Sequence, residues 1–363
     1  MRKGRRTALW VAARATNRAL LVRAYGNSYL SEYRQLLAQF DRRPKTVLND
    51  IWASAAAEVG AAVSGDWNSG FEFHLGNAHA RVDKWDTHLD PPEAIRRSLD
   101  KPLAVARLAD AGVAVPDQVP FSLREVGHAV ARLRREDGRW VLKPRADAAG
   151  RGVTCGIEKP ADLTRAIIAA APSGSEFVLE RQVAGAVYRL LILDGELLDV
   201  VRRDPSSVEG DGVSTIRDLI GSENQARVDA AGSRGNQLVQ PDHDCLLALR
   251  AQEIDLASVP PPRVRHPVKH SNGDGGRFDT HSVPLSVVSR EVVDDATRAV
   301  ASVGLRLAGV DLVTPDLSKG ITAAGGAIID VNGPPGLHYH SLTANTTQAN
   351  HVAARILRCL LEA

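Results

Sequence analysis

The sequence predicts an α/β protein of two or three lobes, and three observations support this fold class. The chain has 363 residues, which is too long for one small domain. Its composition of 44% hydrophobic and 24% charged residues is typical of a globular protein. Short apolar runs that end at glycine or proline alternate with helical patterns over most of the length, and no internal repeat is visible.

The first hundred residues are expected to be helical up to about Phe40, with a second helix at 51–63. Residues 71–75 then alternate like a strand, because apolar and polar side chains take turns. Residues 77–82 are interpreted as the continuation of this strand beyond Gly76.

The remainder of the chain alternates strands and helices. Asp194-Gly195 between two apolar runs predicts a hairpin of strands 187–193 and 196–201. Residues 221–262 give no clear pattern. Further strands are expected at 140–144, 153–157, 176–180, 308–313 and 327–332, and further helices at 103–111, 163–171, 291–303 and 349–361.

Charge and cysteine content limit the classes of function. The net charge is +2, from 45 basic and 43 acidic residues, so the balance gives no reason to expect nucleic acid as a partner. Cys155, Cys245 and Cys359 are far apart and lack the spacing of a zinc site. This cysteine usage favours a reducing cytoplasm as the location.

The N-terminal apolar run at 7–22 is interrupted by Arg14, Asn17 and Arg18, so we expect neither a signal segment nor a membrane span. The run predicts a partly amphipathic helix with basic residues around it. A surface or interface helix is the main interpretation, and a helix lying on a membrane surface is the alternative. Such a helix could form the interface of a homo-oligomer.

The run Ile328-Ile-Asp-Val-Asn predicts a metal-binding strand. Side chains alternate along a strand, so Asp330 and Asn332 lie on one face, about 7 Å apart. Asp311 occupies a similar strand, and hard oxygen ligands on adjacent strands suit Mg²⁺. Taken singly, each is more commonly a strand-end cap or an ion-pair partner. The metal hypothesis therefore depends on the lysines found elsewhere in the chain.

Lys143 ends the apolar strand at 140–144, from which a lysine can reach a phosphate. The following turn contains Gly150 and Gly152 and offers backbone N–H groups to phosphate oxygens, although it lacks the spacing of a P-loop. A second glycine-rich segment at 269–280 is interpreted as a mobile lid. The alternatives are a solvated surface lysine and two ordinary surface loops.

Taken in order, these motifs resemble the ATP-grasp superfamily. They are most like the ATP-grasp part of cyanophycin synthetases and more distantly like D-alanine–D-alanine ligases. The resemblance covers about residues 98–345. It implies an ATP-grasp fold with an N-terminal preATP-grasp-like α/β domain at 1–97, a small lobe at 98–178 and a C-terminal lobe at 179–363. It also implies ATP and Mg²⁺ as cofactors, with two ions.

The resemblance assigns a role to each matching residue. The Tyr188-Arg189 pair and the stretch from Arg202-Arg203 to Gly212 match cyanophycin synthetases, and the implied catalytic residues are Arg203, Arg189 and Arg202. The implied nucleotide-binding residues are Lys101, Lys143, Gly150, Gly152, Glu180, Gln182, Val183, Lys269 and Asn272. The implied metal ligands are Asp311, Asp330 and Asn332. The implied substrate-binding residues are Ser341, His340 and Gly336, with a helix N-cap as the alternative role of Ser341.

Three positions depart from the family pattern. Val187 stands where the family usually has an acid that holds the ribose. Asp330 stands where D-alanine ligases commonly have a glutamate. Gly309 replaces the arginine that D-alanine ligases carry two residues before the first metal aspartate, which argues against that activity.

The implied reaction joins a carboxylic acid to an amine through an acyl-phosphate, on amino-acid or small-peptide substrates. The lysines would neutralise phosphates, and the arginines would stabilise the tetrahedral oxyanion. The alternatives are a non-catalytic ATP-binding protein and an ATP-grasp kinase or ester-forming enzyme. We expect substrate specificity in residues 1–97 and 221–265. The chain lacks the extra ligase domain of cyanophycin synthetases, so we do not expect it to be that enzyme.

Overall fold

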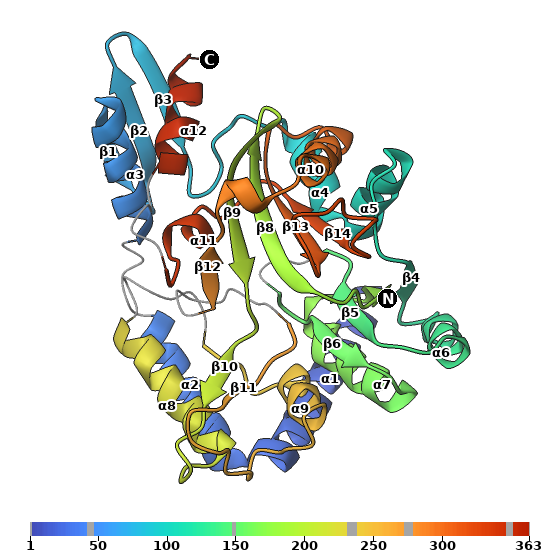
Figure 1. Ribbon diagram of the computed structural model, residues 1–363. Helices are drawn as coiled ribbons and strands as arrows, with labels where there is room; N and C mark the ends of the chain where they lie inside the picture. The colour runs from blue at the N-terminus through green and yellow to red at the C-terminus, as the bar shows by residue number, and fades with distance from the viewer. Residues whose placement is uncertain are drawn as a thin grey trace.

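The computed structural model describes residues 2–41, 47–146, 150–230, 238–271, 279–345 and 351–362. Two antiparallel sheets dominate this part of the chain, and helices cover one face of each (Figure 1). A three-stranded hairpin sheet lies at one end of the molecule, and a group of helices lies at the other. None of the described helices combines the length and the apolar character that crossing a membrane requires.

The smaller of the two sheets has the strand order β4-β7-β5-β6. Its strands are β4 (Gln118–Ser122), β5 (Trp140–Pro144), β6 (Thr154–Ile157) and β7 (Glu176–Arg181), and its covering helices are α6 (Val126–Arg135) and α7 (Pro160–Ala170). Trp140, Leu142 and Leu179 face these helices and are fully buried. Because side chains alternate along a strand, Lys143 and Glu180 point to the opposite face.

The larger sheet has the order β12-β9-β8-β13-β14. Its strands are β8 (Ala186–Leu193), β9 (Glu196–Arg203), β12 (Thr280–Ser282), β13 (Leu307–Thr314) and β14 (Ala327–Asn332). One face packs against α4 (Pro92–Leu99), α5 (Lys101–Asp110) and α10 (Arg290–Val303). Leu190, Val310 and Ile328 lie in this core. The hairpin predicted at Asp194-Gly195 is confirmed, since β8 and β9 pair antiparallel around it.

The opposite face of the larger sheet changes character along its length. At one end, Leu191, Leu193 and Leu307 pack with the hairpin sheet and its two helices. These elements are α3 (Val47–Val59), β1 (Ala62–Asp66), β2 (Gly70–Leu75), β3 (Ala78–Val82) and α12 (His351–Glu362). At the other end this face carries charged side chains, and the short helix α11 (His338–Ser341) lies between the two ends.

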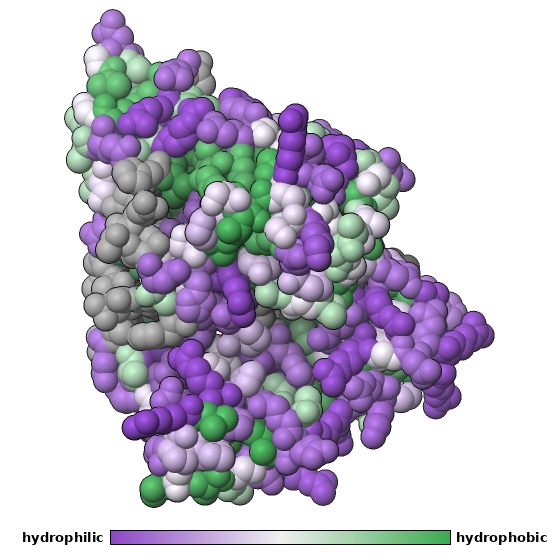
Figure 2. Space-filling view, in the orientation of Figure 1, coloured by the Kyte–Doolittle hydropathy of each residue, from purple (hydrophilic) through white to green (hydrophobic). Residues whose placement is uncertain are grey.

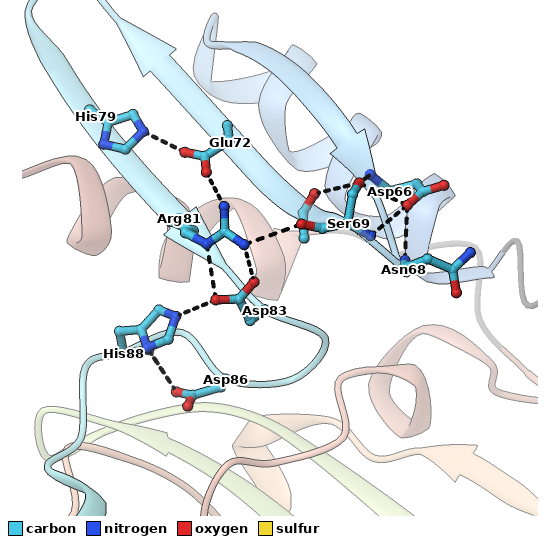
Figure 3. Close-up of polar contacts among 10 residues, drawn as sticks. Asp66, Asn68, Ser69, Glu72, His79, Arg81, Asp83, Asp86 and His88 are labelled. Atoms are coloured by element: carbon cyan, nitrogen blue, oxygen red, sulfur yellow. Dashed lines mark hydrogen bonds and ion pairs between the residues drawn. The ribbon is translucent and has the colours of Figure 1, made fainter.

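The prediction that residues 77–82 continue the preceding strand is wrong. They form β3, which returns antiparallel to β2, with Phe73 opposite Ala80. Gly76 has φ +58° and turns the chain, a conformation that glycine adopts without strain. The exposed face of this hairpin carries a polar network in which Arg81 bonds both Glu72 and Asp83 (Figure 3).

The remaining helices gather at the far end of the molecule (Figure 1). Tyr25, Leu30, Ile216 and Leu249 share one core there. The elements are α1 (Arg2–Tyr25), α2 (Asn27–Asp41), α8 (Ile216–Ala230), α9 (His243–Arg250), β10 (Ser207–Glu209) and β11 (Arg265–Pro267). Residues 2–97 therefore contribute to three cores, since Ala94 of α4 lies in the core of the larger sheet, and the domain boundaries after residues 97 and 178 stay predictions.

Hydrophilic side chains cover most of the face seen in Figure 2. Apolar side chains gather in its upper part, in the region where Figure 1 shows β8, β9 and the segment before α10. Leu285 and Val287 of that segment are 44% and 45% exposed.

Candidate active site

A buried ion pair lies on the face of the smaller sheet opposite α6 and α7. Lys143 Nζ donates to Glu180 Oε1 at 2.7 Å, and both side chains are at least 90% buried. Burial disfavours the charge on Lys143, but Glu180 and Asp330 outweigh it, so the pKa of Lys143 is raised. The lysine is therefore held charged against the carboxylates.

A second lysine, at the start of α5, lies close to Asp330. Asp100 caps α5 by accepting a hydrogen bond from the Leu103 N–H, which places Lys101 at the first helical position. Lys101 Nζ lies 3.8 Å from Asp330 Oδ2 on β14. The structure thus brings together Lys101, Lys143, Glu180 and Asp330, which the sequence scatters over 230 residues.

The polar end of the larger sheet carries a second charged cluster. Arg189 Nε and Nη2 each donate to one oxygen of Asp311 at 2.7 Å. Arg203 Nη1 lies 3.6 Å from Asp311 Oδ1, and Asn332 Nδ2 donates to Asp311 Oδ2 at 3.2 Å. Asp330 lies directly opposite Asp311 in the strand register, which joins this cluster to the lysines.

The electrostatics of Asp311 follow from its neighbours. Burial alone would raise its pKa, but Arg189 and then Arg203 hold the pKa of Asp311 below its usual value. The carboxylate is therefore ionised and both of its oxygens are engaged by arginine. The two guanidinium groups together carry one positive charge more than the Asp311 carboxylate that they contact.

An aromatic ring lies beneath both guanidinium groups. The carbons at the centre of the Arg189 and Arg203 guanidinium groups are 4.6 Å and 4.5 Å from the centroid of the Tyr339 ring. The His338 ring is tilted against Tyr339, with ring centroids 4.0 Å apart, and against Trp85, with ring centroids 4.8 Å apart. The arginines are thus fixed from below by α11 and, through His338, by the segment after β3.

The predicted substrate-binding residues lie on and before α11. His340 Nδ1 lies 2.8 Å from Asp199 Oδ2, and the His340 side chain is fully buried. Ser341 Oγ donates to the Leu337 carbonyl at 3.3 Å. A side chain at Gly336 would collide with His338, since an added Cβ would lie 2.7 Å from its ring. The absence of a side chain at Gly336 therefore leaves room for the His338 ring.

Three other predicted residues lie further from these clusters. Arg202 points to the opposite side of β9 from Arg203, pairs with Asp204 at 2.7 Å and is 49% exposed. Gln182 accepts a hydrogen bond from the Gly156 N–H at 2.8 Å, and its own N–H donates to the Arg139 carbonyl. Lys269 lies between Asp242 and Asp244 beside α9.

The remaining predictions concern the two loops. Gly150 and Gly152 both have positive φ, and an added Cβ at Gly152 would lie 3.2 Å from the Ala170 Cα. The glycine turn therefore packs closely on the end of α7. Val183 follows Gln182 directly after β7. Asn272 and residues 272–278 of the lid predicted at 269–280 lie outside the described residues.

Sequence reasoning missed Tyr339, His338 and Trp85. Tyr339 stands beside the predicted His340, but its contact with the arginines depends on the pairing of β8, β9 and β13. Trp85 is 253 residues from His338, and no local pattern connects them. Only the packing of the hairpin sheet against α11 brings these rings together.

The oxygen donors fit a magnesium ion in part. Asp330 and Asn332 lie on one face of β14, as the alternation of side chains predicts, and carboxylate and amide oxygens suit Mg²⁺. Asp311 is less available, because Arg189 occupies both of its oxygens. Within the described ranges, no three His, Cys, Asp or Glu side chains converge on a metal-sized space. An ion here would therefore depend on Asn332 and on phosphate oxygens.

No protein-family model matches the chain. The chain is 30% identical over 277 residues to a cyanophycin synthetase of Geminocystis herdmanii, covering 73% of this chain and 30% of that protein. It is 29% identical over 244 residues to a glutathione biosynthesis bifunctional protein of Enterococcus faecalis, covering 64% and 31%. The chain therefore spans less than a third of the length of these relatives.

Among solved structures, the fold is similar to the crystal structure of a bifunctional glutathione synthetase from Pasteurella multocida. The TM-score is 0.54 at 22% identity, covering 85% of this chain and 42% of that one. The resemblance predicted from the order of the motifs is confirmed. The chain has the ATP-grasp fold and is a sequence relative of cyanophycin synthetases and of bifunctional glutathione-synthesis proteins.

Proposed function

We propose that the protein is an ADP-forming carboxylate–amine ligase that makes an amide or peptide bond through an acyl-phosphate. Its substrates would be amino acids or small peptides. The observation that carries this proposal is the convergence of Lys101 and Lys143 on Asp330, between the two sheets. Positive charge next to carboxylate and amide oxygens is what the transfer of a phosphoryl group requires, because the reaction depends on positioning and on charge neutralisation.

On this proposal each cluster has a task. Lys101, Lys143 and the turn at Gly150 and Gly152 bind the phosphates of ATP, and the segment Glu180–Val183 binds its base. Asp330 and Asn332 would hold magnesium, and Asp311 would offer the ion the second lone pair of an oxygen that Arg189 already engages. A bound magnesium ion supplies charge neutralisation at the phosphates. The proposal includes two magnesium ions at this site.

Arg189 and Arg203 are placed to act after activation of the acid. An amine that attacks the acyl carbon creates an oxyanion, which preorganised cationic donors stabilise. The two guanidinium groups are buried, fixed by Asp311 and stacked on Tyr339. They need little reorganisation when the charge develops, which is the property that such a site requires.

Two other functions use the same fold. A binding-only protein would need no arginine pair at the polar end of the sheet, and the buried Arg189 and Arg203 favour catalysis over it. A kinase or ester-forming enzyme would use the same lysines with a hydroxyl acceptor. A homodimer and a cytoplasmic location complete the proposal, on the basis of the N-terminal helix and the three unpaired cysteines.

The test is ADP release from the purified protein with Mg-ATP and pools of amino acids, dipeptides and small acids, followed by mass spectrometry. A ligase releases ADP when an acid and an amine are both present, and its product is one water lighter than their sum. ADP release that needs no amine would support the kinase function. Tight ATP binding without ADP in any pool would support the binding-only function.

A further inference from the structure

A cavity of about 720 Å³ lies beside the N-terminal helix pair α1 and α2. Helices α1 and α2 form one wall, with Asn17, Arg18 and Tyr33 among the lining residues. The opposite wall comes from the glycine turn, the end of α7 and the segment 238–243. Its volume is that of sites that hold molecules of several hundred daltons.

The charge of this cavity is strongly asymmetric. Helix α1 carries seven basic residues and no acidic one, whereas the whole chain has a net charge of only +2. The charged lining residues of the cavity are Arg14, Arg18, Arg34, Arg227, Lys269 and Asp242. A concave surface lined by one sign of charge concentrates ligands of the opposite sign.

The two walls differ in how their charges are compensated. Arg227 is 97% buried and is held by Asp279 at 2.6 Å and by Glu223 at 2.8 Å. Lys269 lies between two carboxylates in the same way. By contrast, Arg18 and Arg34 form no ion pair within the part of the chain that the structure describes. The uncompensated positive charge therefore lies on the helix wall.

The position of the cavity links it to the chemistry. Gly150 and Gly152, which on the proposed function hold phosphate, form part of its lining. Ser206 lies at the same wall, three residues beyond Arg203 in the chain. A molecule in the cavity can therefore present one carboxylate to the glycine turn while the rest of it extends along the helix pair.

We propose that this cavity binds the acid substrate, and that this acid carries at least one anionic group besides its reacting carboxylate, bound by Arg18 and Arg34. This inference rests on the proposed ligase function and names the class of its acid. The extra anionic group is a carboxylate or a phosphate, since arginine binds both through two parallel hydrogen bonds. The N-terminal helix pair is then part of the substrate site.

The test uses matched acids with hydroxylamine, which traps an acyl-phosphate whatever the natural amine is. The acids are the tripeptides Ala-Ala-Ala, Glu-Glu-Ala and Ala-phosphoserine-Ala, and ADP and hydroxamate are measured. We expect at least one anionic peptide to have a KM about tenfold or more below that of Ala-Ala-Ala. The preferred anionic peptide identifies the extra group as carboxylate or phosphate.

The variants Arg18→Gln and Arg34→Gln test the assignment. Each is expected to raise the KM for the preferred anionic peptide about tenfold, to leave kcat within about twofold and to leave the KM for Ala-Ala-Ala unchanged. The control is Arg290→Gln on α10, whose side chain is 93% exposed and lies outside the cavity. Equal KM values for all three peptides, unaltered by either variant, would overturn the inference and leave the ligase function standing.

A binding assay separates failure of the cavity from failure of the ligase. If neither these peptides nor the pools of amino acids, dipeptides and small acids support ADP release, the ligase function fails, and the anisotropy of fluorescein-labelled Glu-Glu-Ala and Ala-phosphoserine-Ala still tests the cavity. Weaker binding of a peptide to the Arg18→Gln/Arg34→Gln double variant supports the cavity assignment, and equal binding or none overturns it. Loss of binding to phosphatidylglycerol vesicles with unchanged peptide binding would assign these arginines to a membrane surface instead.

Discussion

Arg189 and Asp311 face each other on adjacent strands and form a two-point ion pair, with both donor–acceptor distances at 2.7 Å. The pair is more than 90% buried, and Tyr339 lies beneath the guanidinium. Arg203 lies 3.6 Å from the same carboxylate. Asp311 therefore orients two cations at the centre of the candidate site, in addition to any part it takes in binding magnesium.

The two neighbouring arginines of β9 allow a matched comparison. We expect Arg203→Gln to lower kcat about 10² to 10³-fold, the usual loss when one donor to an oxyanion is removed. Arg202→Gln should lower kcat less than about tenfold by the same scale, because Arg202 points away from Asp311 and is 49% exposed. The measurement is steady-state ADP and amide formation. Equal losses in the two variants would contradict this division of roles.

The buried Lys143–Glu180 pair predicts a coupled effect on stability and on nucleotide binding. Lys143→Ala leaves Glu180 buried without its partner, at a cost of about 3–5 kcal/mol in the free energy of unfolding. The variant should also fail to bind ATP, because a phosphate-binding charge is lost. Urea unfolding and ATP titration measure the two effects.

The double variant Lys143→Met with Glu180→Gln is the control for burial. It removes both charges, so it should recover most of the stability without restoring ATP binding. Lys319→Ala, at a side chain that is 64% exposed, should change neither quantity. ATP binding by Lys143→Ala at the wild-type affinity would rule out the role of this lysine.

Asp330→Asn should raise the magnesium concentration required for half-maximal activity at least tenfold, because an anionic oxygen ligand becomes neutral. The change keeps the size of the side chain, so the fold should remain intact. The matched control is Asp294→Asn on α10, at a carboxylate that is 56% exposed and outside the site. Wild-type activity of Asp330→Asn at low magnesium would exclude it as a ligand.

The stability of the protein should fall when the pH drops below about 6.5. Burial, and then the charges of Arg189 and Arg203, lower the pKa of His338 well below its ordinary value. Burial also lowers the pKa of His243 to about 4. Below pH 6.5 the unfolded chain therefore binds protons that the folded chain does not, and each such proton removes up to about 1.4 kcal/mol per pH unit.

The variant His338→Gln removes one of the two histidines that produce this pH dependence. Urea unfolding between pH 7.5 and 5.5 should show a pH dependence that is shallower by about one proton than in the wild type. His128→Gln on α6, at an exposed position, should keep the wild-type dependence. An unchanged slope in His338→Gln would show that His338 does not carry this effect.

Much of the fold could be predicted from the sequence, because its signals are local. The strand 140–144, the Asp194-Gly195 hairpin and the helix 291–303 all appear close to their predicted bounds. The pattern at 71–82 predicts one strand but forms two, since alternation alone does not distinguish a continued strand from a return at Gly76. Helices α8 and α9 gave no pattern because their stability depends on the core they share with α1 and α2.

By itself the sequence determined which residues can do the chemistry. It identified the lysine at a strand end, the carboxylate and amide on one face of a strand, and the order of the motifs. Only the tertiary structure decided which of them meet. It brought Arg189 and Arg203 to Asp311, placed Trp85 against His338 and set the basic helix α1 beside the glycine turn. The reason is physical, since alternation and turns fix local geometry, whereas contacts between distant segments arise from packing.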